Sequence, residues 1–537
     1  MPVHQPRSAD KQPPTRALPT EPLSATRFAE RPPRPCQFPW LYTISGGGND
    51  HKQLRWTWIR GSQPPVGRRW NECKDLSALG AGRFAPTNHP PTPRLQSGLL
   101  FPNSFIIPRE SHHCNLPARH AAHCRGSSII CNVSVQELAR IPRLIDLDAH
   151  VVEPPDVWSS RLPSRYRSVG PRIEHLPAGR PKLSGSGYVE EPGTDGPLVA
   201  WWCYEDHRSS VKRTIAAAGY AAEDVQLKGV TYEEMRPGCW QPEARVADME
   251  ENWVEAQLCF PNYPRFCGQQ FLWGKDRELA LLCVRAYNDW MVEEWCGSSR
   301  GRLIPLCLIP LWDIDLAITE LHRNADRGVR AVAFSELPTY LGLPSIYCGE
   351  WEPFFAACAD TETVLCMHIG SGTKTPQTSP DAPDAVPATI LVGNSINSLT
   401  DFLFSGVLHR HPQLRLMYAE AQIGWIPYVL ERADDVWRTH RGWADSQRFC
   451  PEPPSMYYYR QVSSCFFKDR VGIDLLDRVG ADRIVFETDY PHQDGTWPRS
   501  RQAATDQLGH LDQPVINRIA RGNAIDLLGL PFADGEG

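Results

Sequence analysis

Short apolar runs rich in β-branched residues alternate with longer segments of helical periodicity from residue 143 to near the end of the chain. Alternation of this kind favours parallel strands that are each followed by a helix. The runs predicted to be strands are 144–148, 256–260, 303–309, 329–334, 364–367, 414–418, 464–467 and 483–486. This α/β pattern predicts a (β/α)8 TIM barrel.

Seven segments between and after these strands are predicted to be helices: 277–296, 313–327, 351–359, 388–409, 425–440, 469–479 and 515–528. The last one ends at Gly529, with Pro531 shortly after, which is a usual helix stop. We therefore expect the barrel to cover residues 143–530 and residues 531–537 to form a tail. Residues 151–255, which separate the first two strands, form a long insertion that we expect over the mouth of the barrel.

Residues 1–142 differ in composition from the rest. They hold 18 Lys and Arg against 8 Asp and Glu, and 20 of the 50 prolines. Proline pairs interrupt every candidate element, so we expect a disordered basic extension. Nucleic-acid binding by this segment is a minor alternative, because its arginines are dispersed. A zinc site among the His and Cys residues of 112–124 is disfavoured by their irregular spacing.

The sequence also bears on the cellular compartment. Its 17 cysteines are scattered, and no Cys-x-x-Cys occurs. No apolar run approaches the roughly 18–20 residues that span a bilayer, and the first residues lack the apolar core of a secretory signal. We expect a cytoplasmic protein with reduced thiols and no membrane partner.

Candidate metal ligands stand where three of the predicted strands end. The first strand ends in Asp148 and His150, which share one face because strand side chains alternate. His368 ends the fifth strand, and Asp489 follows the eighth. In a barrel these carboxyl ends meet at one opening. Two imidazoles and two carboxylates suit one divalent ion, with zinc favoured and manganese or iron(II) as alternatives.

Four motifs occur in order along residues 143–530: Ile145-Asp-Leu-Asp-Ala-His150, Ala419-Glu-Ala-Gln-Ile-Gly-Trp425, Glu487-Thr-Asp-Tyr-Pro-His492 and Arg521-Gly-Asn-Ala524. These motifs resemble the amidohydrolase-related family, in the branch that includes aminocarboxymuconate semialdehyde decarboxylase and resorcylate-type decarboxylases. The resemblance implies a (β/α)8 barrel with one divalent metal, usually zinc. By position, it implies Asp148, His150, His368 and Asp489 as the ligands.

The chain departs from that branch at two positions. Asp148 stands where the decarboxylases usually have His or Glu, and Glu420 stands where they have a His. Hydrolysis and decarboxylation of a small carboxylated or aromatic molecule therefore both remain open. The alternative is a non-catalytic barrel that keeps the fold to bind a small molecule. Arg161 and Arg165 could bind a carboxylated substrate, although a solvated position is favoured for both. The family resemblance also suggests a homodimer.

Five residues are assigned roles around the metal. Asp489 is expected to accept and return a proton, and Glu420 is a second catalytic candidate that could instead be an ion-paired residue at a strand end. His492 is expected to orient Asp489 or to belong to a plain loop. Trp425 and Trp497 are expected to wall the pocket or to pack at its rim.

Overall fold

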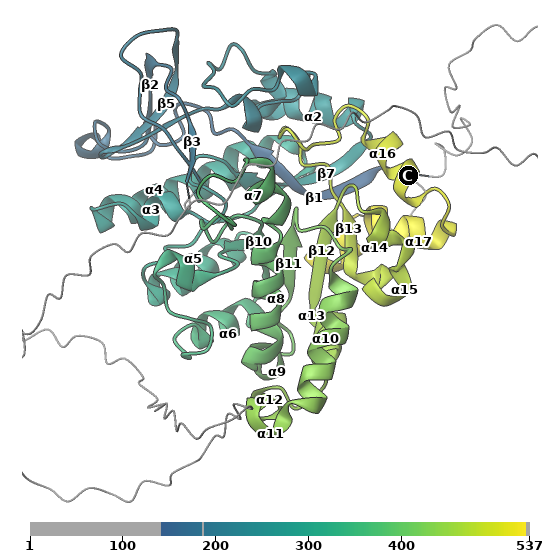
Figure 1. Ribbon diagram of the computed structural model, residues 1–537. Coiled ribbons are helices and arrows are strands. Elements are labelled where there is room, and N and C mark those ends of the chain that lie inside the picture. The colour runs from purple at the N-terminus through teal and green to yellow at the C-terminus, as the bar shows by residue number, and fades with distance from the viewer. Residues whose placement is uncertain (1–140, 185–186, 533–537) are drawn as a thin grey trace, which may run out of the picture. The chain divides into compact units, whose positions relative to one another are not determined.

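The computed structural model of the protein describes residues 141–184 and 187–532. The predicted basic extension lies outside these residues, apart from its last two positions. Within the described ranges, eight strands match the eight predicted for the barrel (Figure 1). They are β1 (Leu144–Val151), β7 (Val254–Pro261), β8 (Leu303–Ile304), β9 (Ala331–Phe334), β10 (Val364–His368), β11 (Leu416–Ala419), β12 (Val462–Phe466) and β13 (Ile484–Phe486).

These strands pair in parallel as two sheets, with the orders β1-β7-β8 and β13-β12-β11-β10-β9. Backbone contacts also join the two sheets. Cys307, after β8, bridges Val332 of β9, the Asp489 amide, after β13, donates to the Asp148 carbonyl of β1 at 2.8 Å, and the His150 amide of β1 donates to the Tyr490 carbonyl at 2.7 Å. The strand order is of the TIM-barrel type, but the ladder does not run as one closed sheet, contrary to the prediction. One reason is that β8 has only two residues, because Pro305 follows it and has no N–H for the ladder.

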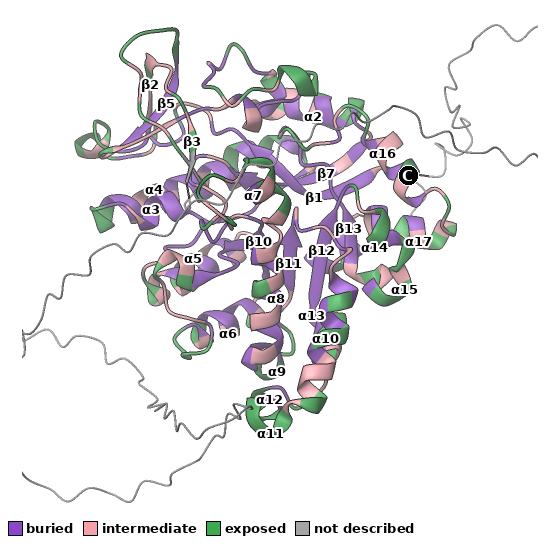
Figure 2. Ribbon diagram, viewed as in Figure 1, coloured by how far each residue is buried: buried purple, intermediate pink, exposed green. Residues whose placement is uncertain are grey.

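The barrel strands are buried on both faces, as Figure 2 shows. Every residue of β1, β9, β10, β11 and β12 is buried. This is the environment of parallel strands covered by helices, and it explains their continuous apolar runs. Polar residues in such a strand, among them Asp146, Asp148 and His150, are unfavourable unless they find a partner.

Helices follow the strands as predicted, but several are interrupted, among them 469–479, which divides into α14 (Arg470–Asp474) and α15 (Leu476–Val479). α4 (Arg277–Trp290) and α5 (Ile314–Ala325) each begin after an aspartate, Asp276 or Asp313, whose carboxylate caps the first amides. The helix predicted at 388–409 is three helices, α7 (Ala385–Ile390), α8 (Gly393–Ser405) and α9 (Val407–Arg410). Gly406, with φ +78°, separates the last two. The segment 515–528 likewise divides into α17, a π-helical turn and α18.

The remaining α-helices are α2 (Pro242–Glu251), α3 (Gln269–Leu272), α6 (Glu352–Asp360), α10 (Ile426–Thr439), α11 (Arg441–Ala444), α12 (Ser446–Phe449), α13 (Pro454–Gln461), α14 (Arg470–Asp474), α15 (Leu476–Val479), α16 (Ser500–Leu508), α17 (Gln513–Asn517) and α18 (Asn523–Leu528). None of the helices in the described ranges has the length and apolar character needed to span a membrane.

The insertion between β1 and β7 carries strands that the sequence analysis did not predict. β2 (Arg172–Pro177), β5 (Leu198–Tyr204) and β6 (His207–Ser210) form an antiparallel sheet, and β3 (Lys182–Ser184) pairs with β4 (Gly187–Val189). The Ala217 amide donates to the Pro491 carbonyl at 2.8 Å, and the Gln493 amide donates to the Thr214 carbonyl at 3.0 Å. The insertion is thus tied to the loop after β13, at the carboxyl ends of the barrel strands (Figure 1).

Candidate metal centre and active site

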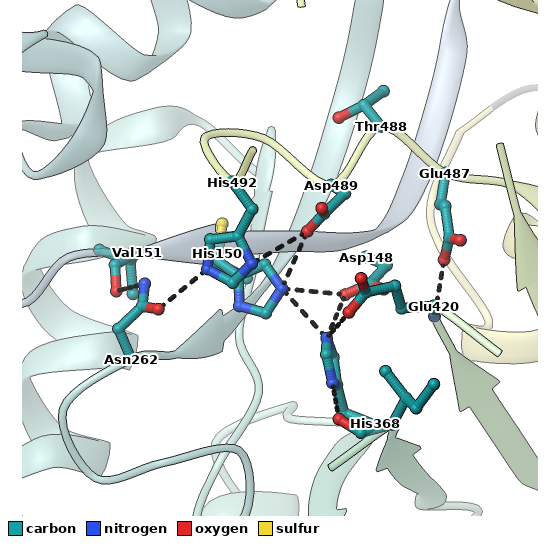
Figure 3. A network of polar contacts seen from close by, with 12 residues as sticks. Asp148, His150, Val151, Asn262, His368, Glu420, Glu487, Thr488, Asp489 and His492 are labelled. Atoms are coloured by element: carbon teal, nitrogen blue, oxygen red, sulfur yellow. Dashed lines mark hydrogen bonds and ion pairs between the residues drawn. The ribbon is translucent and has the colours of Figure 1, made fainter. Parts of the chain in front are cut away.

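Four side chains from three strand ends converge at one point (Figure 3). Asp148 and His150 come from β1, His368 ends β10, and Asp489 follows β13; all four are fully buried. The Nε2 atoms of His150 and His368 lie 3.1 Å apart. Asp148 Oδ1 lies 3.5 Å from both Nε2 atoms, and Asp489 Oδ1 lies 3.3 Å from that of His150. Ligand atoms roughly 2.1 Å from one ion stand about 3.0–3.4 Å from each other, so these separations are those of a metal site.

The cluster presents lone pairs that no hydrogen bond satisfies. Both carboxylate oxygens of Asp148 and of Asp489 are buried without a hydrogen-bond partner in the described part of the chain. Burial holds the pKa of His150 and of His368 well below the usual value, so both rings are neutral. His368 Nδ1 donates to the Ile369 carbonyl at 2.7 Å, which leaves its Nε2 lone pair free for a cation. The residues present therefore fit a divalent metal ion.

Buried negative charge accumulates around the same point. Burial raises the pKa of Asp148 well above its usual range, and the neighbouring Glu487 and Asp489 raise it further. Burial and Asp489 raise the pKa of Glu420 in the same way, and burial raises that of Glu487. A divalent cation would offset this repulsion, because it is the largest local charge in such a site.

Glu420 follows β11 and faces both the cluster and solvent. Its Oε2 lies 3.5 Å from His368 Nε2, and its side chain is 21% exposed. Among the described residues, Glu420 therefore contacts a candidate metal ligand, and not an arginine that would make it a simple ion-paired residue at a strand end. Glu420 (φ +56°) and Asp489 (φ +50°) both adopt the left-handed backbone conformation, which is uncommon outside glycine and concentrates at functional sites. A tight turn immediately after each strand thus directs the two carboxylates to one place.

His492 lies against two members of the cluster. Its Nδ1 is 3.2 Å from Asp489 Oδ1, and its ring stacks on that of His150 with 3.6 Å between centroids. Asn262 donates its amide N–H to the Val151 carbonyl at 2.9 Å, so its oxygen faces His492 Nε2, also at 2.9 Å. His492 Nε2 must therefore carry a hydrogen and donate it to the Asn262 oxygen. His492 is thus held in one orientation beside Asp489, whose carboxylate accepts no hydrogen bond from it in the described part of the chain.

Asp146, which the sequence analysis did not single out, joins the strands that carry the ligands. Its carboxylate accepts hydrogen bonds from the Thr488 amide at 3.0 Å, from the Thr488 hydroxyl, and from the Gln257 side chain at 3.0 Å. Thr488 immediately precedes Asp489. The bonds therefore position Asp489 relative to β1. The sequence did contain a signal for this role: an aspartate inside an apolar strand, because a buried carboxylate needs hydrogen-bond partners.

Arg245 of α2, also missed, holds the backbone of a ligand. Its guanidinium is fully buried and donates to the His150 carbonyl at 2.6 Å and to the Gly238 carbonyl at 2.7 Å. It also lies 4.4 Å from the centroid of the Tyr490 ring, a favourable cation–π contact. Because His150 is 95 positions away along the chain, no local pattern could have revealed this role.

A cavity of about 1270 Å³ opens from the cluster to solvent. Strand-end loops and the insertion form its walls, and Glu420, Asp489, His492 and Trp425 line it. Trp425 is held by a hydrogen bond from its Nε1 to the Ala421 carbonyl at 2.7 Å. Typical small-molecule sites have volumes of about 300–1,000 Å³, so a small aromatic molecule can be accommodated.

Three residues nominated from the sequence do not line this cavity within the described ranges. Trp497 packs beside Arg236, whose guanidinium lies 4.4 Å from its ring centroid, and beside Tyr490. The Thr496 amide donates to the Thr488 carbonyl at 2.9 Å, so the loop folds back before Trp497. Arg161 and Arg165 form ion pairs with glutamates of the helical segment 277–295.

Comparisons with known sequences identify the family of the chain. A family model described as amidohydrolase matches residues 145–530, which include every candidate ligand. Gamma-resorcylate decarboxylase of Rhizobium sp. (strain MTP-10005) is 25% identical over 235 residues, 41% of this chain and 68% of the relative. The 2-amino-3-carboxymuconate-6-semialdehyde decarboxylase of Dictyostelium discoideum is 21% identical over 341 residues, 61% of this chain and 85% of the relative.

Solved structures resemble the chain at the level of fold. An amidohydrolase from Mycobacterium avium subsp. paratuberculosis K-10 superposes with a TM-score of 0.54 at 21% identity, covering 72% of this chain and 99% of the other. Metarhizium anisopliae IDCase in apo form gives a TM-score of 0.52 at 16% identity, with coverages of 73% and 99%. These similarities support the TIM-barrel type of fold.

Proposed function

Because the chain belongs to the amidohydrolase family, we propose that it is a metal-dependent carboxy-lyase acting on a small aromatic carboxylate. One observation carries the proposal: Asp148, His150, His368 and Asp489 converge where a cavity also exposes Glu420. Relatives named as decarboxylases favour decarboxylation over hydrolysis.

In this proposal Asp148, His150, His368 and Asp489 hold one divalent ion. Two imidazole nitrogens with carboxylate oxygens suit zinc, and manganese or iron(II) are the alternatives. When bound, the ion supplies positive charge that orients the substrate carboxylate and polarises an adjacent oxygen. The protein contributes the orientation of the ligands, through Asp146 and Arg245.

Decarboxylation breaks the bond between a ring carbon and the carboxylate carbon, and the electron pair left on the ring takes up a proton. We assign this proton to Glu420, which faces the cavity and whose pKa is raised by burial and by the neighbouring Asp489. Asp489 is the second proton carrier, because its carboxylate lines the same cavity.

The first experiment measures metal content and carbon dioxide release together. The protein, purified without chelators and supplemented with Zn²⁺ or Mn²⁺, is expected to hold about one equivalent of metal and to release carbon dioxide from dihydroxybenzoate-like acids. Lactones and amides are assayed in parallel for hydrolysis. Less than a tenth of an equivalent of metal would exclude the proposed enzyme, and hydrolysis without carbon dioxide release would exclude the lyase.

The second experiment tests the proton donor. Glu420→Gln is expected to keep its metal and lose at least about a hundredfold in turnover, the scale of general acid catalysis. Glu191→Gln is the matched control, because it makes the same chemical change at an exposed glutamate that lines the same cavity. Near-normal turnover in Glu420→Gln would remove Glu420 from the reaction.

A further inference from the structure

Arg265 lines the same cavity as Glu420 and Asp489 and carries a charge without an acidic partner. It lies in the turn after β7 and is half-buried. Among the described residues, no carboxylate lies within ion-pair distance of its guanidinium, and no hydrogen-bond acceptor contacts it. Its side chain lies 5.4 Å from the centroid of the Trp273 ring, which also lines the cavity. Partial removal of a charged guanidinium from water costs free energy, and this cost is offset only when an anion binds to it.

The contrast with Arg208, another arginine of the cavity wall, shows what is unusual here. Arg208 donates to the carbonyls of Glu205 at 3.0 Å and of His207 at 2.8 Å, so its donors are engaged by its own loop. Arg265 has no such bonds in the described part of the chain. Burial lowers its pKa, and no neighbouring carboxylate raises it. Its donors therefore remain available for a ligand.

A second cation stands near Arg265. The Lys212 side chain is only 14% exposed and lies 3.4 Å from Glu190, which also accepts a hydrogen bond from the Ser210 hydroxyl. Burial lowers the pKa of Lys212, and the charge of Arg265 lowers it further, so the two cations interact. Glu190 is thus paired with Lys212, and among the described residues Arg265 keeps its charge without an acidic partner.

The turn that carries Arg265 also packs on the metal ligands. The adjacent Phe266 ring stacks on His368 with 4.0 Å between centroids and meets His150 at 5.7 Å. The Arg265 amide donates to the Asn262 carbonyl at 3.1 Å, and the Gly268 amide donates to the Arg265 carbonyl at 3.2 Å. This short turn therefore fixes the backbone of Arg265 relative to the cluster, on which recognition of one rigid molecule depends.

We propose that Arg265, with Lys212 beside it, binds a second carboxylate of the substrate, so that the acid accepted by this site is an aromatic dicarboxylate. The inference rests on the proposed function for the first carboxylate, which lies at the metal. The second lies against Arg265, whose planar guanidinium matches a carboxylate with two parallel hydrogen bonds. Mono-acids of the same ring size leave this charge unmatched.

Calorimetry on the full chain tests the proposal with two probes, isophthalate and benzoate, in the presence and absence of Mn²⁺. Wild-type protein is expected to bind isophthalate at least tenfold more tightly than benzoate. Arg265→Gln is expected to bind both probes within twofold of each other, and Arg265→Lys to retain part of the preference, because it keeps charge without the paired donors. Arg180→Gln, which removes a charge from an exposed arginine of the cavity wall, is expected to behave as wild type.

Two results would overturn the inference: a wild-type preference below twofold, or a tenfold preference that survives in Arg265→Gln. Circular dichroism and thermal melting confirm that each variant is folded. If metal binds and mono-acids are decarboxylated without this preference, the inference fails while the proposed function stands. If no metal binds, the proposed function fails, and the preference for isophthalate is still read from the metal-free titration.

Discussion

The Nε2 atoms of His150 and His368 lie 3.1 Å apart, although 218 positions separate the two residues along the chain. The strands that carry them, β1 and β10, belong to different sheets. Both rings are neutral, and the carboxylate of Asp148 lies 3.5 Å from each. Only the assembled set of strands creates this arrangement. In it, the two imidazole nitrogens and the carboxylate face one another with no common partner among the described residues. A divalent ion would supply that partner.

Removal of one imidazole is expected to abolish stoichiometric metal binding. We expect His368→Ala to retain less than about a tenth of the wild-type zinc or manganese after desalting, because loss of a ligand exceeds the 10–100-fold effect of losing a supporting residue. Elemental analysis measures this directly. His411→Ala is the control, since it removes a histidine that is paired instead with Glu352 at 2.8 Å. Equal metal contents in the two variants would exclude His368 as a ligand.

Neutralisation of one buried carboxylate is expected to stabilise the protein when no metal is bound. In the presence of EDTA, Asp148→Asn should melt about 2–4 °C above wild type, because it removes one of several repelling charges. Added Mn²⁺ should reverse the order, since about 100 Kd of free ligand stabilises wild type by about 2.7 kcal/mol. Differential scanning fluorimetry compares the four states. A variant that melts below wild type in EDTA would contradict the charge argument.

Loss of the Arg245 guanidinium is expected to destabilise the protein and to loosen the site. Arg245→Met leaves the carbonyls of His150 and Gly238 without their charged donor, so we expect a loss of about 3 kcal/mol in the free energy of unfolding. Metal affinity should fall as well, because the backbone of a ligand is released. Urea unfolding and metal titration measure the two effects. Unchanged metal affinity in a folded Arg245→Met protein would show that Arg245 has no positioning role.

Glu336, which follows β9, is expected to make stability depend on pH. Burial raises its pKa to about 7, although the Gly370 amide donates to it at 2.9 Å and the Ser395 hydroxyl at 3.0 Å. The folded state therefore binds this proton more tightly than the unfolded state. The resulting stability is fully present below pH ~4.5 and is lost as the pH rises through about 7.

Glu336→Gln removes this dependence while its amide group can still accept from the glycine amide and donate to the serine hydroxyl. Relative to wild type, its free energy of unfolding is expected to rise by up to about 3 kcal/mol between pH 5 and pH 8.5. Urea unfolding across this range measures the difference, with Glu243→Gln, an exposed glutamate, as control. A constant difference between Glu336→Gln and wild type would show that Glu336 does not titrate there.

The buried parallel strands were predictable because each is a short continuous apolar run, as in Val364–His368. The candidate ligands at their ends were nominated by the rule that chemistry stands at the carboxyl ends. The insertion was harder to interpret. Most of β2 is only half-buried, so its mixture of polar and apolar residues carries no clear period. The apolar strand β5 lies beside Pro- and Gly-rich segments that concealed it.

The sequence by itself determined the order of the barrel strands and their helices and the types of residue at the strand ends, because both depend on local periodicity and on the alternation of side chains. Tertiary structure alone decided which of these residues touch. It placed Asp146, Arg245 and Arg265 around the site and Trp497 away from the cavity. The reason is physical: the partners of a buried charged group come from distant segments of the chain. Only the packing of the whole chain decides whether such a partner lies beside it.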